Sequence, residues 1–360
     1  MSQYNRNIFS SGIIKLTALL ILFGATSCIQ KQNATISSVS TYIQQLNQTN
    51  DAQTRVNIID AIAKAPEKVN TVAPMLVKML QDNNAQVRAS AAKALGEIYF
   101  RGDVKSVPNS TVIQALTVAL QDKEAQVRAN AAGAIALIAL PYKSADASIN
   151  TTTGALVTAS QDKDINVRIN ASRALGIVGA NATSGATPNK YIDTKAVISS
   201  LLKLLQDKNP QVRATAAGAL VELAGGIKAT DGAVPELIKA LQDSEPGTRF
   251  YAAKALGRIG ALACVSIPAL TYILQNNQKY ELINTAHQSV VPVTVLSLGN
   301  IAMSLQSASH NLSKSELTAV ITDLSTTIKI IEDPKNKYSP EIIASVRNPL
   351  ENLKKELKNR

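Results

Sequence analysis

Apolar and polar positions alternate along most of the chain with the period of short amphipathic helices that come in pairs. In residues 76–98 the first apolar run consists of Leu76, Val77, Met79 and Leu80. A polar turn of about four residues starts at Asp82. A second apolar stripe then recurs near every 3.6 residues and consists of Val87, Ala91, Ala94, Leu95 and Ile98. This pattern predicts helix, turn, helix.

Five segments share this layout without gaps over their centres. They cover residues 76–98, 116–138, 156–178, 201–223 and 237–259. Each carries Gln-Asp, an Arg six residues after the Asp, and then an Ala-rich stretch. The repeated acids and bases are Asp82 and Arg88, Asp122 and Arg128, Asp162 and Arg168, Asp207 and Arg213, and Asp243 and Arg249. One helix pair cannot bury both of its faces, so neighbouring pairs are predicted to stack.

Weaker copies flank the clear ones. Residues 42–64 keep Arg55 in the Arg position but have Thr49 where the Asp is expected. Residues 266–303 hold a copy with a polar insertion, and residues 312–357 hold a last pair of helical patterns. The prediction is a repeat domain over 41–305 and a helical cap over 312–360, because the terminal units of a stack meet water on one side.

The repeat resembles the HEAT repeat, in particular the short type found in phycobilin lyases and many bacterial proteins, over roughly residues 40–305. The resemblance implies an all-α fold, a right-handed α-solenoid (superhelix) of stacked antiparallel helix pairs. It also implies that the repeated Asp and Arg residues form a ladder of hydrogen bonds along the stack. An Asp near a helix start satisfies free backbone N–H groups, and an Arg fork can bridge to the next repeat. Since every repeat carries the pair, we interpret it as structural.

The N-terminus has the layout of a targeting segment. Residues 1–15 are mostly polar with Arg6 and Lys15, and an apolar run of 9 residues follows from Leu16 to Gly24. Small residues stand directly before Cys28. This order is typical of a secretory signal, and the run is shorter than the about 20 residues of a membrane span. Residues 1–27 are therefore predicted to be a signal peptide.

The residues before Cys28 resemble the lipobox of bacterial lipoproteins, although Ala25 stands where that family usually has Leu. The resemblance implies a lipid on Cys28 and anchoring to a membrane of the cell envelope, on its periplasmic or outer face. Polar residues 28–40 fit a flexible tether. The alternative is cleavage by ordinary signal peptidase near Ser27, with Cys28 incidental.

Composition narrows the chemistry. Hydrophobic residues make up 46% of the chain, aromatics only 4%, and Trp is absent, which suits helix interfaces closely packed by small side chains. The formal net charge of +11 is spread along the chain without an Arg-rich arm, so it favours acidic partners only weakly and does not indicate nucleic-acid binding. His287 and His310, the only histidines, form no metal-binding pattern. Cys264 in an apolar context is expected to be a small buried hydrophobe. No catalytic residue, metal or cofactor is predicted.

The longer connections between repeats hold several aromatic residues beside Lys or Arg. These connections are predicted over residues 99–110, 139–153, 179–194 and 224–233, along one edge of the superhelix, with an insertion over 276–290. The candidate binding edge comprises Tyr99, Phe100, Arg101, Tyr142, Tyr191 and Tyr280. The alternative is that these rings pin the loops to the repeats.

The sequence therefore predicts an exported, non-catalytic scaffold or adaptor that binds unidentified protein partners in a long concave groove and reaches the membrane through its lipid. Two alternatives stay open. One is a chromophore-attachment enzyme or accessory subunit like a phycobilin lyase, which the repeat permits and export opposes. The other is a structural envelope protein without a defined ligand.

Overall fold

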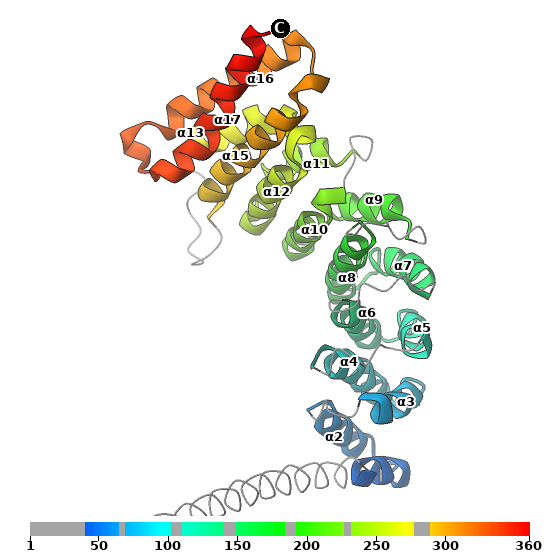
Figure 1. Ribbon diagram of the computed structural model, residues 1–360. Helices are drawn as coiled ribbons and strands as arrows, with labels where there is room; N and C mark the ends of the chain where they lie inside the picture. Colours follow the sequence, from blue (N-terminus) through cyan, green and yellow to red (C-terminus); the bar gives the residue numbers. More distant parts are fainter. Residues whose placement is uncertain are drawn as a thin grey trace, which may run out of the picture. The chain divides into compact units, whose positions relative to one another are not determined.

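The computed structural model describes residues 40–64, 69–101, 110–139, 148–183, 192–226, 232–276 and 289–360. Regular secondary structure in these ranges is entirely helical, and successive helices run antiparallel in pairs (Figure 1). The predicted all-α fold of stacked helix pairs is confirmed. The chain divides into two compact units, Met1–Ser106 and Val107–Arg360. The predicted signal peptide and Cys28 lie outside the described residues.

The first unit contains a short helix over residues 40–48, α2 (Ala52–Ala63), α3 (Val69–Met79) and α4 (Ala85–Arg101). Asp51 begins α2 because its carboxylate accepts a hydrogen bond from the backbone N–H of Thr54 at 2.7 Å. Both α2 and α3 pack on α4. Their interface consists of fully buried aliphatic side chains, among them Ile59, Leu76 and Leu95, as the apolar stripes predict.

The second unit continues the pairs. Its repeat helices are α5 (Ser110–Ala119) with α6 (Ala125–Ala139), α7 (Ser148–Ala159) with α8 (Ile165–Thr183), α9 (Thr194–Leu204) with α10 (Pro210–Leu223), α11 (Ala233–Ala240) with α12 (Pro246–Ile259), and α13 (Ile267–Gln275) with α15 (Val290–Ala308). The predicted cap is a further pair, α16 (Lys314–Ile331) and α17 (Pro340–Lys358). Asn209 and Pro210 start α10 together: the Asn side chain accepts from two backbone N–H groups and Pro occupies the first turn.

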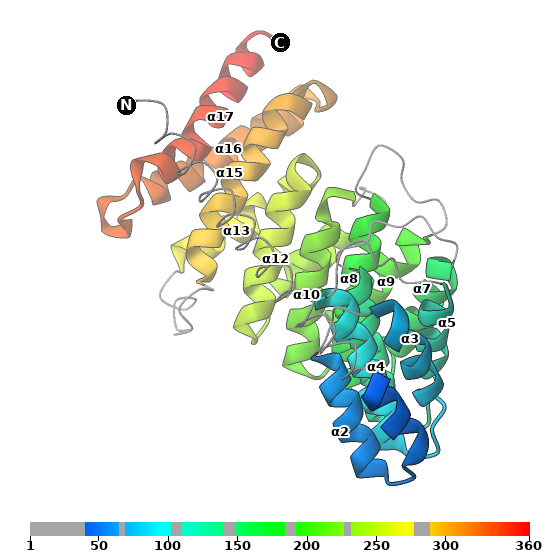
Figure 2. The same cartoon turned by 60° about the horizontal axis from the view of Figure 1, so that its bottom comes forward.

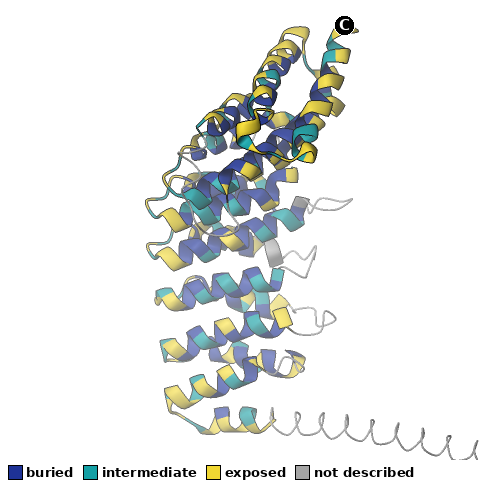
Figure 3. Ribbon diagram, turned by 90° about the vertical axis from the view of Figure 1, so that its left-hand side faces the viewer, coloured by how far each residue is buried: buried dark blue, intermediate teal, exposed yellow. Residues whose placement is uncertain are grey.

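Within the second unit the second helix of each pair contacts the second helix of the next, from α6 through α8, α10, α12 and α15 to α17 (Figures 1 and 2). The first helices α5, α7, α9 and α11 form a neighbouring row. Buried residues lie where the helices face each other, and exposed residues lie on the outer sides (Figure 3). Each repeat therefore contributes one helix to each row.

Glycines on the second helices allow the backbone of one helix to contact side chains of the next second helix directly. A Cβ atom added at Gly176 of α8 would lie 2.7 Å from the Cβ of Ala219 on α10. A Cβ at Gly257 of α12 would lie 2.6 Å from Ser297 of α15, and one at Gly299 would lie 2.7 Å from the Oγ of Ser345 on α17. Any side chain at these positions would push neighbouring repeats apart.

Two stretches are long and apolar enough by composition to cross a membrane, Pro246–Gln275 and Val290–Asn311. The first is not one helix, because the 3-10 segment Gly260–Ser266 separates α12 from α13. In the apolar windows of these stretches, 56% and 61% of the residues are buried inside the protein. Both stretches also pack on neighbouring repeats, so we interpret them as core helices of the stack.

Candidate functional site

The repeated Asp residues hold the turn between the two helices of each repeat. In all five clear repeats the Asp carboxylate accepts a hydrogen bond from the backbone N–H two residues later, at 2.7–2.9 Å. This contact closes a local turn and fixes the carboxylate beside the start of the second helix. The predicted partner of the Asp is a free N–H group of the helix start, whereas the N–H that it binds belongs to the turn.

Each repeated Arg spans its own turn and the next one. Through one guanidinium nitrogen, Arg128, Arg168 and Arg213 donate to the carbonyl of the Asp in their own repeat at 2.8–2.9 Å. Their other two nitrogens donate to both carboxylate oxygens of the Asp in the following repeat, at 2.7–3.0 Å. The bonded pairs are Arg128 with Asp162, Arg168 with Asp207, and Arg213 with Asp243.

The same contacts reach both ends of the repeat series. Arg55, in the degenerate first copy, is ion-paired with Asp82 inside the first unit. Arg88 and Arg249 donate to the carbonyls of Asp82 and Asp243 in their own turns, each at 2.8 Å. In the described residues, Arg55, Arg128, Arg168 and Arg213 thus bind the Asp of the following repeat, and Arg88 and Arg249 bind the backbone of their own turns.

Two carboxylates of the ladder, those of Asp162 and Asp207, have lowered pKa values. Burial alone would raise the pKa values of Asp162 and Asp207. The side-chain hydrogen bonds from Arg128 and Arg168, with the backbone N–H of the turn, outweigh that effect and hold both pKa values below the ordinary range. A bidentate guanidinium–carboxylate pair is strong and directional, so it fixes the register of adjacent repeats.

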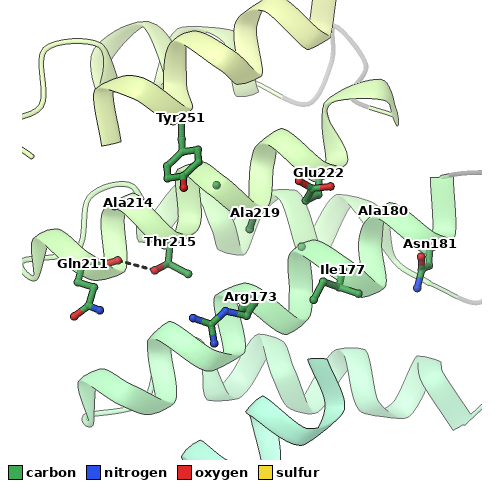
Figure 4. A pocket seen from close by; sticks show the side chains of 12 residues that line it. Arg173, Ile177, Ala180, Asn181, Gln211, Ala214, Thr215, Ala219, Glu222 and Tyr251 are labelled. Atoms are coloured by element: carbon green, nitrogen blue, oxygen red, sulfur yellow. Dashed lines mark hydrogen bonds between the residues drawn. The ribbon is translucent and has the colours of Figure 1, made fainter. Parts of the chain in front are cut away.

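A groove whose lining contains no ladder residue lies over the second helices. It has a volume of about 660 Å³ and runs over α10 between α8 and α12 (Figure 4). Its floor is made of small residues of α10, among them Ala214, Gly218 and Ala219. Gly218 stands five residues after Arg213, and a side chain there would meet only the Tyr251 ring, at 3.8 Å. The missing side chain deepens the surface at that point.

The walls of the groove carry polar groups. Arg173, Ile177 and Asn181 line it from α8, one helical turn apart from each other. Gln211, Thr215 and Glu222 follow along α10. The Tyr251 ring projects from α12 toward α10, with its hydroxyl toward the groove (Figure 4). The groove therefore presents hydrogen-bonding side chains along a rigid helical floor.

A second hollow of about 460 Å³ lies beside the turns of α5–α6 and α7–α8. Its charged lining includes Arg128 and Asp162, which are bonded to each other. The groove over α10 is different, because neither Arg173 nor Glu222 belongs to the ladder. We therefore take the groove as the candidate binding site.

The candidate binding edge needs correction at its first members. Helix α4 continues to Arg101, so Tyr99, Phe100 and Arg101 belong to its last turns and not to a connecting loop. The helical register turns Tyr99 inward, where it is 4% exposed, while Phe100 is 53% exposed. Tyr142, Tyr191 and Tyr280 lie outside the described residues. The connections are also shorter than predicted, since α7 already begins at Ser148.

The remaining sequence candidates show no catalytic arrangement where the structure describes them. Cys264 is half-buried in the segment Gly260–Ser266, and burial raises the pKa of its thiol, which disfavours the reactive thiolate. His310 is exposed, and His287 lies outside the described residues. The described residues contain no group of three or more His, Cys, Asp or Glu side chains arranged to hold a metal ion.

Comparison with known families agrees with the repeat architecture. The family model of the sister chromatid cohesion protein PDS5 matches residues 1–224, more than half of the chain. The chain belongs to this family. A second family model, that of HEAT repeats, matches residues 198–290 of the same PDS5-family chain. No curated protein matches it at a significant level.

Several solved structures are similar to the PDS5-family chain. An engineered protein aligns with a TM-score of 0.64 at 22% identity, covering 88% of this chain and 78% of its own. YibA of Escherichia coli aligns with a TM-score of 0.51 at 19% identity, covering 89% of this chain and 96% of its own. Computationally designed armadillo repeat proteins for modular peptide recognition align with a TM-score of 0.48 at 22% identity, over 63% and 98% of the two chains. At these identities the first two alignments show a common fold.

Proposed function

We propose that this protein is a non-catalytic scaffold that binds a protein partner in the groove over α10. The observation that carries the proposal is the groove itself: a hollow of about 660 Å³ over the packed helices α8, α10 and α12, floored by small residues and lined with hydrogen-bonding side chains. Concave surfaces of this kind, with a few placed polar groups, are the usual form of binding sites.

The ladder supports this role by holding the groove in shape. Arg168 joins the turn before α8 to the turn before α10, and Arg213 joins the turn before α10 to the turn before α12. The three helices that form the groove are thus fixed in register before any partner arrives. A site that is ordered in advance loses less conformational entropy on binding.

We further propose that the scaffold works outside the cytoplasm, on a membrane of the cell envelope. The support is the sequence: the signal-like residues 1–27 and the lipobox-like residues before Cys28. The family name refers to sister chromatid cohesion. We do not assign that role to this chain, because the proposed secretory signal would direct it away from chromosomes.

The test is mass spectrometry of the mature N-terminal peptide together with cross-linking of intact cells. We expect a peptide that begins at Cys28 with a diacylglyceryl group, and reproducible cross-links to one partner from a photo-reactive residue placed at Gln211 or Asn181 of the groove. An N-terminus that still begins at Met1 would contradict export and would favour the chromophore-attachment alternative. Cross-linking that yields no reproducible partner would favour the structural alternative.

A further inference from the structure

We infer that the groove over α10 binds an extended, acidic segment of its partner, with Arg173 as the group that receives an acidic side chain. The inference rests on the proposed scaffold function and gives it a ligand chemistry. Three properties of the groove carry it: its length, the kind of hydrogen-bonding groups along it, and the charges on its rims.

The length of the groove fits a short stretch of extended chain. Its lining on α10 runs from Gln211 to Glu222. At a rise of 1.5 Å per residue, this stretch of helix covers about 16 Å. An extended peptide advances roughly 3.3 Å per residue, so about five residues lie along the floor.

The polar groups favour an extended conformation over a helix. Gln211, Thr215, Asn181 and Tyr251 carry neutral amides and hydroxyls, groups that accept hydrogen bonds as well as donate them. Within the protein the Thr215 hydroxyl donates to the carbonyl of Gln211 at 2.8 Å, and the Asn181 amide donates to the carbonyl of Ala139 at 2.7 Å. A bound helix has already satisfied its own backbone N–H and C=O groups, so such side chains would have little to bind. An extended peptide presents those backbone groups unpaired, as in other modes of strand recognition.

The α8 side of the groove carries a cation. Arg173 on α8 is exposed, and its guanidinium donates to the side chain of Asn170 on its own helix at 3.0 Å. Exposed Lys254 stands five residues after Arg249, the same register that Arg173 has after Arg168 and Gly218 has after Arg213. Arg173 lines the groove on the α8 side of Gly218, and Lys254 stands on α12 outside the lining.

The one carboxylate that lines the groove is partly offset. Glu222 lies 3.9 Å from the guanidinium of Arg258 on α12. Arg173 is thus the one cation and Glu222 the one carboxylate of the lining, and Glu222 is paired with Arg258 from outside the lining. Ile177 follows Arg173 by one turn and offers an apolar contact beside it. An acidic side chain at Arg173 with an apolar neighbour matches this surface.

The experiment measures binding of the whole mature protein to labelled short peptides by fluorescence anisotropy. The probes are extended peptides of alternating Glu and Val, of alternating Lys and Val, and of alternating Ser and Val, and a helical peptide of Ala and Glu. We expect the Glu–Val peptide to bind best. Arg173→Ala should weaken it roughly tenfold to a hundredfold, as the loss of a hydrogen bond between charged groups implies. Arg173→Glu should transfer the preference to the Lys–Val peptide.

The control is Lys203→Ala, which removes an exposed cation from α9 in the row of first helices and should leave binding unchanged. Equal binding of the three extended peptides, or binding of none of them, would overturn the inference, and tighter binding of the helical peptide would overturn the extended conformation. A cross-linked partner that is captured equally well by Arg173→Glu would also refute the inference while leaving the scaffold function intact. Failure to capture any partner refutes the function itself.

Discussion

Arg168→Ala tests the role of the ladder most directly. Arg168 is buried, and its guanidinium makes two bonds to the carboxylate of Asp207 at 2.7 and 3.0 Å. It also donates to the carbonyls of Asp162 and Lys163 at 2.9 and 3.1 Å. Alanine removes all four contacts and leaves the carboxylate of Asp207, which is 11% exposed, with the backbone N–H of Asn209.

The magnitude follows from the charge that is left behind. Breaking one side of a buried ion pair costs about 3–5 kcal/mol, because the remaining charge is desolvated without its partner. The slight exposure of Asp207 lets water relieve part of that cost, so we expect the free energy of unfolding to fall by about 3 kcal/mol. In a repeat stack, stability is close to a sum of repeat and interface contributions, so the loss should also weaken the coupling between α8 and α10. The unfolding transition should become broader.

Urea denaturation followed by circular dichroism measures both effects, through the midpoint and the slope of the transition. The matched control is Arg173→Ala in the same helix, an exposed position that should change stability by no more than about 0.5 kcal/mol. If Arg168→Ala matches that control in stability and loses the partner, the repeated charges belong to the binding surface and our interpretation of the ladder is wrong.

Three further expectations follow from the packing and the charges. Gly176→Ala should destabilise the protein by about 1–3 kcal/mol in thermal unfolding, because the new Cβ would lie 2.7 Å from Ala219. Gly218→Ala should instead stabilise it by about 0.5–1 kcal/mol, because alanine favours the helix and its Cβ makes only an ordinary contact with Tyr251. The opposite order of stabilities would contradict the close approach of α8 and α10. The same Gly218→Ala substitution should weaken binding of the Glu–Val peptide despite the added stability, because it raises the floor of the groove, and unchanged binding would place the peptide elsewhere. Because the pKa values of Asp162 and Asp207 lie below the ordinary value of 3.8, the stability from the ladder should be fully present above that pH and lost as the pH falls below it. An acid titration of the melting temperature checks this, and Arg168→Ala should flatten the curve.

The repeats, the turns and the positions of the ladder residues could be predicted from the sequence because they depend on local chemistry. The spacing from Asp162 to Arg168 recurs together with the apolar stripe, and both patterns can be recognised within a single repeat of the sequence. The groove could not be predicted in the same way. Gly218 and Tyr251 are ordinary residues of two different repeats, and they meet only because α10 and α12 pack side by side.

The prediction for the aromatic edge failed at Tyr99 for a related reason. The apolar stripe predicts a helix end near Ile98, but α4 runs three residues further, to Arg101. That extension decides which way each ring points. One sequence signal could have found Gly218. Residues at the same distance from the repeated Arg occupy equivalent positions in every repeat, and Gly218 is the fifth residue after Arg213. Comparing the fifth residue after each repeated Arg would therefore have drawn attention to it.

Each rung of the ladder joins residues that are far apart by different amounts along the chain. The separations are 34 residues for Arg128 and Asp162, 39 for Arg168 and Asp207, and 30 for Arg213 and Asp243, yet the shortest bond is 2.7 Å in every case. In each of these repeats the Arg binds the Asp of the following repeat, and the Asp is bound by the Arg of the preceding repeat. A whole repeat that carries both residues can therefore follow any other such repeat. The chain can therefore lengthen or shorten by complete repeats, and vary its connecting segments, without leaving a charge stranded at an internal junction. The Arg–Asp contact between repeats is therefore compatible with duplication of a whole repeat within the chain.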